Sequence, residues 1–245
     1  MTIGALGTTG AGEERPVLIV TGLAQEARIA AGPGMSVICS SSNPHQLRSI
    51  LSDFDHSSIR GIISFGVAGG LDPMLHSGDI VVATEVVAGD QRWQAETGFT
   101  GDLITNADLG RRQVARGILA GVEEVVVGPK GKAALRARTG AAAVDMESHI
   151  AAHYAADKGL PFAALRVISD PASRALPALA VDALKPCGSI DPWKVMKGIA
   201  RNPTAIPSLM STARDFNRAL EGLRGCRGFL FDGLFGEFAA AEATA

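Results

Sequence analysis

The sequence has 245 residues, of which 23 are basic and 25 acidic, so its formal net charge is −2 at pH 7. This length is sufficient for one α/β domain with a full hydrophobic core, and a hydrophobic fraction of 47% excludes a disordered chain. The near-neutral charge argues against a dedicated nucleic-acid-binding protein, and three widely separated cysteines exclude a disulfide framework. No apolar run approaches membrane-spanning length and no secretory signal is recognisable, so we expect a cytoplasmic protein.

Short runs rich in Val and Ile predict buried strands, and helix-start signals lie between several of them. Residues 1–15, rich in Gly and Thr, predict a flexible leader. Strands are expected at residues 17–20, 35–40, 61–66, 79–87, 122–127, 141–144 and 161–168, and helices at 44–51, 106–119 and 146–158. Beyond residue 170 a helical region is punctuated by six prolines. The alternation predicts an α/β fold: a single domain over residues 16–228 in which helices flank a central mixed β-sheet, with a helical C-terminal flank.

The last 17 residues, 229–245, hold a third of the aromatic side chains of a chain that has few of them. Phe231, Leu234, Phe235 and Phe238 recur at helical spacing and predict an amphipathic tail. One interpretation is that this face docks onto the body of the protein or onto a neighbouring subunit. The other is that it meets a lipid-like substrate, or the surface of the inner membrane that holds one.

Two segments that follow predicted strands are candidates for ligand binding. The run Gly66-Val67-Ala68-Gly69-Gly70 would allow a turn whose N–H groups cradle an anion, and an ordinary tight turn is the alternative. Glu26 and Arg28 follow the first strand, which would place an acid and a cation at the edge of the sheet where ligands bind in open α/β folds. A surface ion pair on a first helical turn is the alternative for these two residues.

Residues 144–148 (VDMES) and 166–170 (RVISD) each end a predicted strand, and both would lie along the same rim of the sheet. Two carboxylates in one cleft can divide their roles: one accepts hydrogen bonds from sugar hydroxyls, and the other, with a raised pKa, donates a proton to a leaving group. The alternative for Asp170 is a helix N-cap or turn. For Glu147 it is a first-turn carboxylate favoured by the helix dipole.

Two further patterns carry less information. His149 and His153 lie four residues apart on one predicted helix, but no third ligand accompanies them, so a structural pair is favoured and no metal site is expected. Residues 128–132 (GPKGK) have the composition of a phosphate loop without its spacing, so a solvated turn is expected there.

The motifs are, in chain order, GVAGGL leading into residues 77–82 (SGDIVV), then VDMES, then RVISD. Their order and spacing resemble those of the purine nucleoside phosphorylase / methylthioadenosine–adenosylhomocysteine nucleosidase superfamily. The resemblance covers residues 17–172. Within this superfamily the chain is most similar to the hopanoid-associated phosphorylase branch, through GLAQEARIA near its start, the short segment 128–140 and residues 191–193 (DPW). That branch is linked to the removal of adenine from adenosylhopane in hopanoid biosynthesis.

The resemblance implies a role for each residue that matches the motifs. Glu147 would hold the ribose 2′- and 3′-hydroxyls, with Met146 packed on the sugar. Asp170 would protonate N7 of the purine, and Ser169 would help to position the base. Protonation at N7 makes the base a neutral leaving group, and a carboxylate near the ribose favours the developing oxocarbenium character.

The resemblance also implies a nucleophile subsite at Gly66, Glu26 and Arg28, with Val67, Ala68 and Gly69 against the substrate. A cation at Arg28 suits phosphate better than water. We therefore expect phosphorolysis, with inorganic phosphate as co-substrate and no cofactor. Hydrolysis is the near alternative, because Glu26 remains from the acidic run that positions water in nucleosidases. A catalytically silent nucleoside-binding module is the more distant one.

The expected partner is a small-molecule nucleoside, with a lipid-linked one as a special case, and a homo-oligomer is expected by analogy with the family. Nucleosidases stack the base on a segment that bears an aromatic side chain. Residues 128–140 contain no aromatic, so Phe99 or a partner subunit is expected to supply the stacking.

Overall fold

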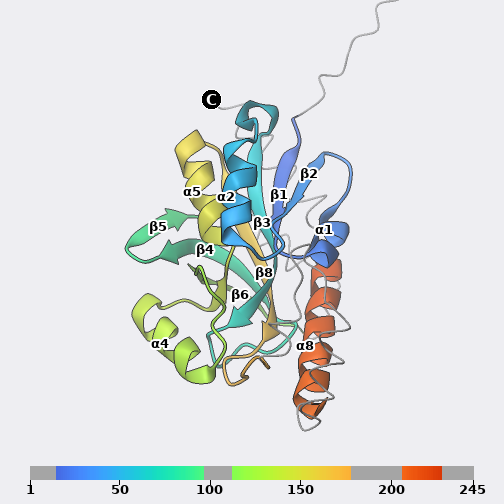
Figure 1. Ribbon diagram of the computed structural model, residues 1–245, viewed down its shortest axis with the longest axis vertical. Helices are drawn as coiled ribbons and strands as arrows, with labels where there is room; N and C mark the ends of the chain where they lie inside the picture. The colour runs from blue at the N-terminus through green and yellow to red at the C-terminus, as the bar shows by residue number, and fades with distance from the viewer. Residues whose placement is uncertain (1–14, 97–111, 178–205, 228–245) are drawn as a thin grey trace, which may run out of the picture.

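The computed structural model of the chain describes residues 15–96, 112–177 and 206–227, which form a mixed sheet with helices on both of its faces (Figure 1). The strands are β1 Val17–Thr21, β2 Met35–Cys39, β3 Gly61–Gly70, β4 Ile80–Ala88, β5 Gln91–Gln94, β6 Val114–Gly121, β7 Ala143–Asp145 and β8 Phe162–Asp170. The helices are α1 Ala24–Ala30, α2 Pro44–Ser52, the short η1 His56–Ser58, α4 Pro129–Thr139, α5 Ser148–Lys158 and α8 Ile206–Gly225. The predicted α/β class with a mixed central sheet is confirmed.

The strand pairings bring the two predicted carboxylate motifs to one place. β1 lies between β2 and β3 and is parallel to both. β3 pairs with β8, β8 with β4, β4 with β6, β6 with β7, and β7 again with the end of β3. These five pairings close a ring. Within it Gly69 of β3 pairs with Val144 on one side and with Asp170 on the other, so the ends of β3, β7 and β8 meet.

The alternation of side chains along the strands divides the core into two layers. Val17 and Ile19 of β1 point to the face covered by α1 and α8, where they share a cluster with Leu223. Leu18 and Val20 point to the opposite face, which α2 and α5 cover. Because these strands are buried on both faces, they are continuous apolar runs in the sequence, which is why they could be recognised there.

Local signals set the helix ends. The side chain of Asn43 caps α2 by accepting a hydrogen bond from the Gln46 amide at 3.1 Å, and Pro44 occupies the first helical position. α4 and α5 each end at a glycine in the left-handed region, Gly140 at φ +70° and Gly159 at φ +64°. Among the described residues, no helix is long and apolar enough to cross a membrane.

Several predicted elements differ from the structure. Residues 122–127 do not form a strand but connect β6 to α4. Residues 114–119, predicted to end a helix, belong to the strand β6. Residues 66–70 continue β3 instead of turning, because β7 and β8 pair with them to the end. The leader up to residue 14, the first part of the helix predicted at 106–119, and the tail from 229 lie outside the described residues.

Candidate active site

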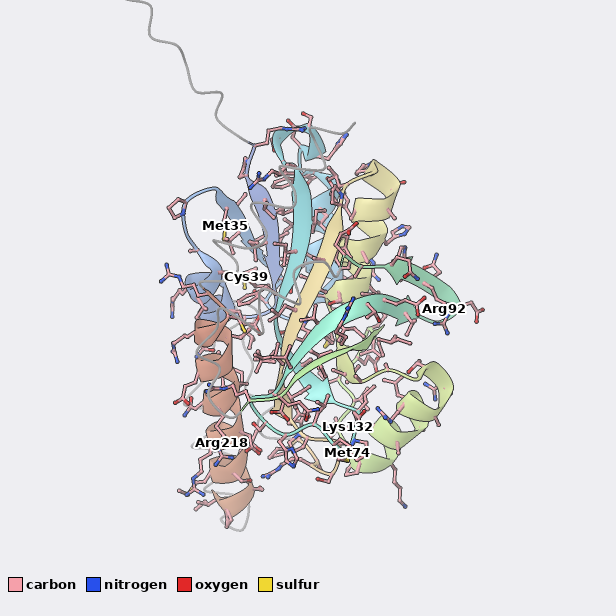
Figure 2. All side chains as sticks on the ribbon, turned by 180° about the vertical axis from the view of Figure 1, so that it is seen from behind. Met35, Cys39, Met74, Arg92, Lys132 and Arg218 are labelled. Carbon is pink, nitrogen blue, oxygen red and sulfur yellow. The ribbon has the colours of Figure 1, made fainter. Side chains whose placement is uncertain are left out.

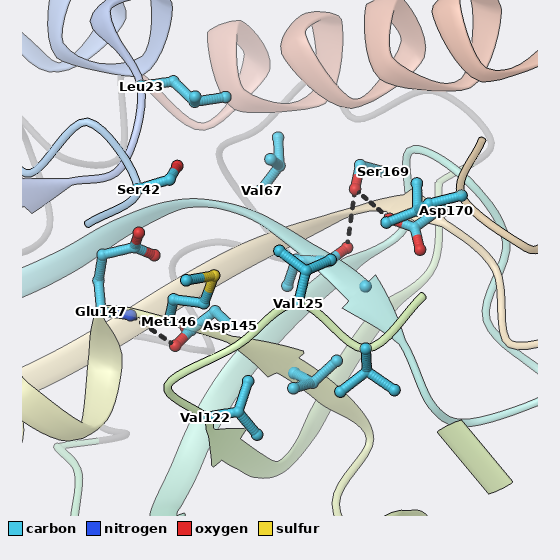
Figure 3. A pocket seen from close by; sticks show the side chains of 15 residues that line it. Leu23, Ser42, Val67, Val122, Val125, Asp145, Met146, Glu147, Ser169 and Asp170 are labelled. Atoms are coloured by element: carbon cyan, nitrogen blue, oxygen red, sulfur yellow. Dashed lines mark hydrogen bonds between the residues drawn. The ribbon is translucent and has the colours of Figure 1, made fainter. Parts of the chain in front are cut away.

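A cavity of about 240 Å³ lies where the ends of β3, β7 and β8 meet. In Figure 3, Glu147 and Asp170 stand at its opposite ends. The lining includes seven residues that the sequence predicted for the site: Val67, Ala68, Gly69, Met146, Glu147, Ser169 and Asp170. The rest is mostly aliphatic: Leu23, Val122, Val125, Val126, Val144 and Leu176, together with Ser42 and Asp145.

The aliphatic wall comes largely from the segment that was predicted to be a strand. Residues 122–127 run along the cavity, and the Leu176 amide donates a hydrogen bond to the Val127 carbonyl at 2.9 Å, which ties a second segment to the first. None of the lining residues in the described part of the chain is aromatic. Phe99, expected to stack the base, lies outside the described residues.

Asp170 ends β8 beside an irregularity in the sheet. The register between β3 and β8 shifts after Ala68, so Ser169 has no partner on β3, and such a bulge redirects side chains. The hydroxyl of Ser169 lies 2.6 Å from Asp170 Oδ1, and Lys132 Nζ lies 2.5 Å from Oδ2. Burial raises the pKa of Asp170, while the charge of Lys132 opposes that rise. Asp170 can therefore hold a proton and release it next to a cation.

Lys132 is a residue that the sequence analysis missed. Residues 128–132 were predicted to be a solvated turn, but α4 begins at Pro129 and turns Lys132 into the protein, where it is fully buried. The segment 128–132, which has only the composition of a phosphate loop, therefore forms the start of a helix that carries a buried cation.

At the other end of the cavity, Glu147 occupies the N-cap position of α5. Its Oε1 accepts a hydrogen bond from the Ser40 hydroxyl at 3.4 Å. A Cβ added at Gly22 would lie 2.7 Å from the same oxygen, so the close approach of this carboxylate to the first strand needs glycine there. Burial raises the pKa of Glu147 to about 7, against the lowering effect of Arg166.

Arg166 is the buried cation of this end. Its Nε donates to Asp145 Oδ2 at 2.5 Å, its Nη2 donates to Ser64 Oγ at 2.5 Å, and Nη2 also lies 3.8 Å from Glu147 Oε2. Nη1 is buried without a hydrogen-bond partner among the described residues. Burial works to lower the pKa of Arg166, but the charges of Asp145, Glu147 and Glu26 raise it overall. The sequence signal that could have revealed it is a single arginine inside the apolar strand FAALRVISD.

Glu26 lies beneath the same end of the cavity. Its carboxylate accepts hydrogen bonds from the amides of Gly22 at 2.9 Å, Leu23 at 2.8 Å and Val67 at 2.8 Å. The Val67 amide, which was expected to face an anion, is therefore already engaged. Burial raises the pKa of Glu26, while Arg166 lowers it. Gly66 lies beside both groups, and a Cβ there would overlap Arg166 Nη1 and lie 2.8 Å from the Glu26 carboxylate.

The structure does not bring Arg28 to this cluster. Arg28 is exposed on α1 and does not line the cavity. The two histidines are also apart from it: His149 Nε2 lies 2.9 Å from Glu123, and His153 packs edge-on against Trp93. Within the described residues, no group of His, Cys, Asp and Glu is arranged to hold a metal ion.

The cavity thus has the buried carboxyl group of Asp170, whose pKa burial raises, at one end. At the other end lies Glu147, next to the cluster of buried acids around the Arg166 guanidinium. The model of a known family, the phosphorylase superfamily, matches residues 6–182 of the sequence. The chain belongs to the phosphorylase superfamily. The superfamily suggested by the sequence motifs is confirmed, whereas the hopanoid-associated branch stays a prediction. No curated protein matches the chain significantly.

Solved structures share the superfamily fold at low sequence identity. The 5′-methylthioadenosine/S-adenosylhomocysteine nucleosidase of Helicobacter pylori, bound to butyl-thio-DADMe-Immucillin-A, is 15% identical with a TM-score of 0.64, covering 91% of this chain and 99% of that one. Futalosine hydrolase of the same species is 15% identical with a TM-score of 0.63, and the match covers 91% of this chain and 98% of that one. S-adenosylhomocysteine nucleosidase of Streptococcus pyogenes, in complex with 5-methylthiotubericidin, is 16% identical with a TM-score of 0.62. That match covers 91% of this chain and 98% of the nucleosidase. The likeness extends over almost the whole length of these relatives.

Proposed function

We propose that this protein cleaves the N-glycosidic bond of an adenine nucleoside and that water is the nucleophile. The observation that carries the proposal is the pairing of Glu26 with Arg166 at the end of the cavity where Glu147 lies, opposite Asp170. A carboxylate held by three backbone amides can accept a proton from water. Nη1 of Arg166, which has no hydrogen-bond partner in the described part of the chain, can donate a hydrogen bond to the same molecule.

The other groups divide the remaining work along the cavity. Glu147 accepts hydrogen bonds from the ribose hydroxyls, and Met146 packs on the sugar. Asp170 gives its proton to N7 of the base as the bond to C1′ breaks, so that adenine leaves as a neutral molecule. Ser169 orients the Asp170 carboxyl, since its hydroxyl lies 2.6 Å from Oδ1.

The charge of the cluster favours water over phosphate. Among the described residues, the acidic side chains of Glu26, Asp145 and Glu147 are buried around the guanidinium of Arg166. When these groups are ionised, each negative charge that Arg166 does not neutralise would cost on the order of 4 kcal/mol if a phosphate lay about 4 Å away, at an effective dielectric constant of 20. Water carries no net charge and avoids this cost. The phosphorolysis expected from the sequence depended on Arg28, which points into solvent.

For the substrate, we propose adenosylhopane, on the resemblance of the sequence to the hopanoid-associated branch. The aliphatic wall of Val122, Val125, Val126 and Leu176 supports an apolar substituent at this site. The similar solved structures support an adenine nucleoside more generally, because the names of two of them specify 5′-methylthioadenosine or S-adenosylhomocysteine.

The test is to incubate the protein with adenosine, 5′-methylthioadenosine and adenosylhopane, with inorganic phosphate and with phosphate removed enzymatically. Adenine, the free pentose and the pentose 1-phosphate are then quantified. We expect adenine release at the same rate in both conditions, with the free pentose as co-product. Release that needs phosphate and yields a pentose 1-phosphate would establish phosphorolysis instead, and binding without any release would establish a silent nucleoside-binding module.

A further inference from the structure

Lys132 is buried at the end of the cavity where Asp170 lies. It belongs to the first turn of α4, and its side chain is directed from that helix towards the end of β8 (Figure 2). The exposed fraction of the Lys132 side chain is 1%, and that of the Asp170 side chain is 6%. The two groups therefore face each other almost completely shielded from bulk solvent.

All the donors of this ammonium group have acceptors. Nζ lies 2.5 Å from Asp170 Oδ2, 3.3 Å from the Asp170 carbonyl oxygen and 3.0 Å from the Pro171 carbonyl oxygen. An ammonium group has three N–H donors, so these three contacts match its capacity. The contacts hold both the side chain and the main chain of Asp170, which fixes the direction of the carboxyl.

Neither burial nor the helix favours a lysine at this position. A buried ammonium is costly unless it is paired, and a cation in the first turn is unfavourable to the helix dipole. The first turn of α4 contains no acidic residue to offset it. Packing alone does not explain Lys132, and the ion pair with Asp170 does.

We propose that Lys132 is a positioning residue that aims the Asp170 carboxyl at the base and stabilises the carboxylate left behind when its proton is transferred. The inference rests on the proposed function, because it assigns Asp170 as the proton donor. In that step, the Asp170 O–H bond breaks and its proton forms the N–H bond at N7. The electron pair of the C1′–N9 glycosidic bond moves onto the base, and the negative charge stays on Asp170, next to Lys132. The oxygen of the water molecule forms the new bond to C1′, and the proton that this water loses goes to Glu26.

The ion pair gives this step a distinct dependence on pH. The charge of Lys132 makes Asp170 a stronger acid than burial alone would. Among the described residues, the negative charge of Asp215 on α8 also acts on Asp170 and raises its pKa. The Asp215 carboxylate is itself paired: Oδ2 lies 3.2 Å from Arg174 Nη2, and Oδ1 lies 3.5 Å from Arg218 Nη1. Removing the charge of Lys132 should therefore keep Asp170 protonated to higher pH and make it a poorer donor.

The experiment compares Lys132→Gln, which keeps N–H donors without the charge, with Lys132→Arg, which keeps the charge. Lys130→Gln is the matched control, since Lys130 lies on the same helix and is exposed. For Lys132→Gln we expect kcat to fall about 10- to 100-fold, KM to change little, and the basic limb of the kcat/KM profile to move to higher pH. In Lys132→Arg the limb should stay at its wild-type position, and Lys130→Gln should behave as wild type.

The outcomes separate this proposal from the proposed function. Wild-type kcat and an unmoved limb in Lys132→Gln would overturn the role of Lys132 while leaving the function intact. If the wild type releases no base, the function fails, and a ¹³C NMR titration of the Asp170 carboxyl in the same variants still tests the coupling without turnover. If Lys132→Gln does not fold, the Lys132→Arg variant decides. A basic limb of its kcat/KM profile that moves to higher pH, although the positive charge is retained, would contradict the proposal.

Discussion

At the scale of single residues, Asp170 carries the clearest consequence for activity. Its carboxyl is buried, and burial raises its pKa, so it can hold a proton when the base binds. Asp170→Asn keeps the size of the side chain but removes the transferable proton. We expect kcat to fall more than about 100-fold while the affinity for a nucleoside analogue is retained, as measured by base release and calorimetry. Asp90→Asn, an exposed change, is the control, and full activity in Asp170→Asn would contradict the assignment.

Gly66 tests the other end of the cavity. An added methyl group would overlap Arg166 Nη1 and crowd the Glu26 carboxylate, and both neighbours are buried. Gly66→Ala should therefore displace these two groups, lower kcat by roughly 10-fold or more, and reduce stability by about 1–3 kcal/mol as an overpacked site. Gly128→Ala is the matched control, because nothing lies within 4 Å of its added Cβ. Equal effects of the two changes would show that Gly66 has no special role.

At the scale of elements, the sequence predicted what local patterns determine. The strands around β1 and β8 were found because burial on both faces makes them continuous apolar runs. β6 was missed because its sequence VARGILAG mixes an arginine and glycines with apolar residues, and its identity as a strand depends on pairing with β4 and β7. Conversely, the valines of residues 122–127 resemble a strand but line a cavity. Local propensity predicts neither the strand β6 nor the role of residues 122–127 as a cavity wall.

The site divides in the same way. Glu147, Ser169 and Asp170 were found because motifs at strand ends meet at one rim of a sheet. Lys132 and Arg166 were not predicted as site residues. The first stands in the polar run GPKGK and the second is a single arginine in a strand, and their importance depends on the acidic partners that the tertiary structure places beside them. The same reason explains why Arg28 was chosen as the site cation: its position after β1 was correct, but the helical turn carries its side chain away.

The helix α8 offers a prediction about packing. Its Leu223 is fully buried against β8 and its neighbours, whereas Met210 on the same helix is 51% exposed. Leu223→Ala should lower the free energy of unfolding by about 2–5 kcal/mol, and Met210→Ala should change it by less than about 0.5 kcal/mol. Urea denaturation measures both. A small loss in Leu223→Ala would mean that α8 contributes little to holding the sheet.

At the scale of the whole molecule, the ring of five strands concentrates charge in the core. Four carboxyl groups, those of Glu26, Asp145, Glu147 and Asp170, are buried around the ends of the cavity, and the buried cations that face them among the described residues are Arg166 and Lys132. Such a centre lowers stability, because desolvation of a charged group is only partly offset by its partners. A site that protonates a base and activates a nucleophile needs these groups, so function and stability oppose each other here.

This opposition predicts a stability that falls as the pH rises. Burial raises the pKa of Glu147 to about 7 from 4.5, and it also raises those of Glu26 and Asp170. A folded-state pKa above the unfolded value means that the folded state binds more protons between the two values, so stability decreases with pH across that window. For Glu147 the window runs from about pH 4.5 to about pH 7. The group with the largest opposite shift, Glu123, has its pKa lowered to about 2, so it titrates below this window.

The measurement is the free energy of unfolding from urea denaturation at pH 5 and pH 8. We expect the wild type to lose stability between these values, and Glu147→Gln to lose up to about 3 kcal/mol less, since one pKa unit corresponds to about 1.4 kcal/mol. Glu124→Gln, at an exposed position, should follow the wild type. The same Glu147→Gln protein should be inactive, because it no longer offers a carboxylate to the ribose. A wild-type stability that stays level or rises over this range would mean that the buried carboxyl groups are ionised in the folded protein throughout it.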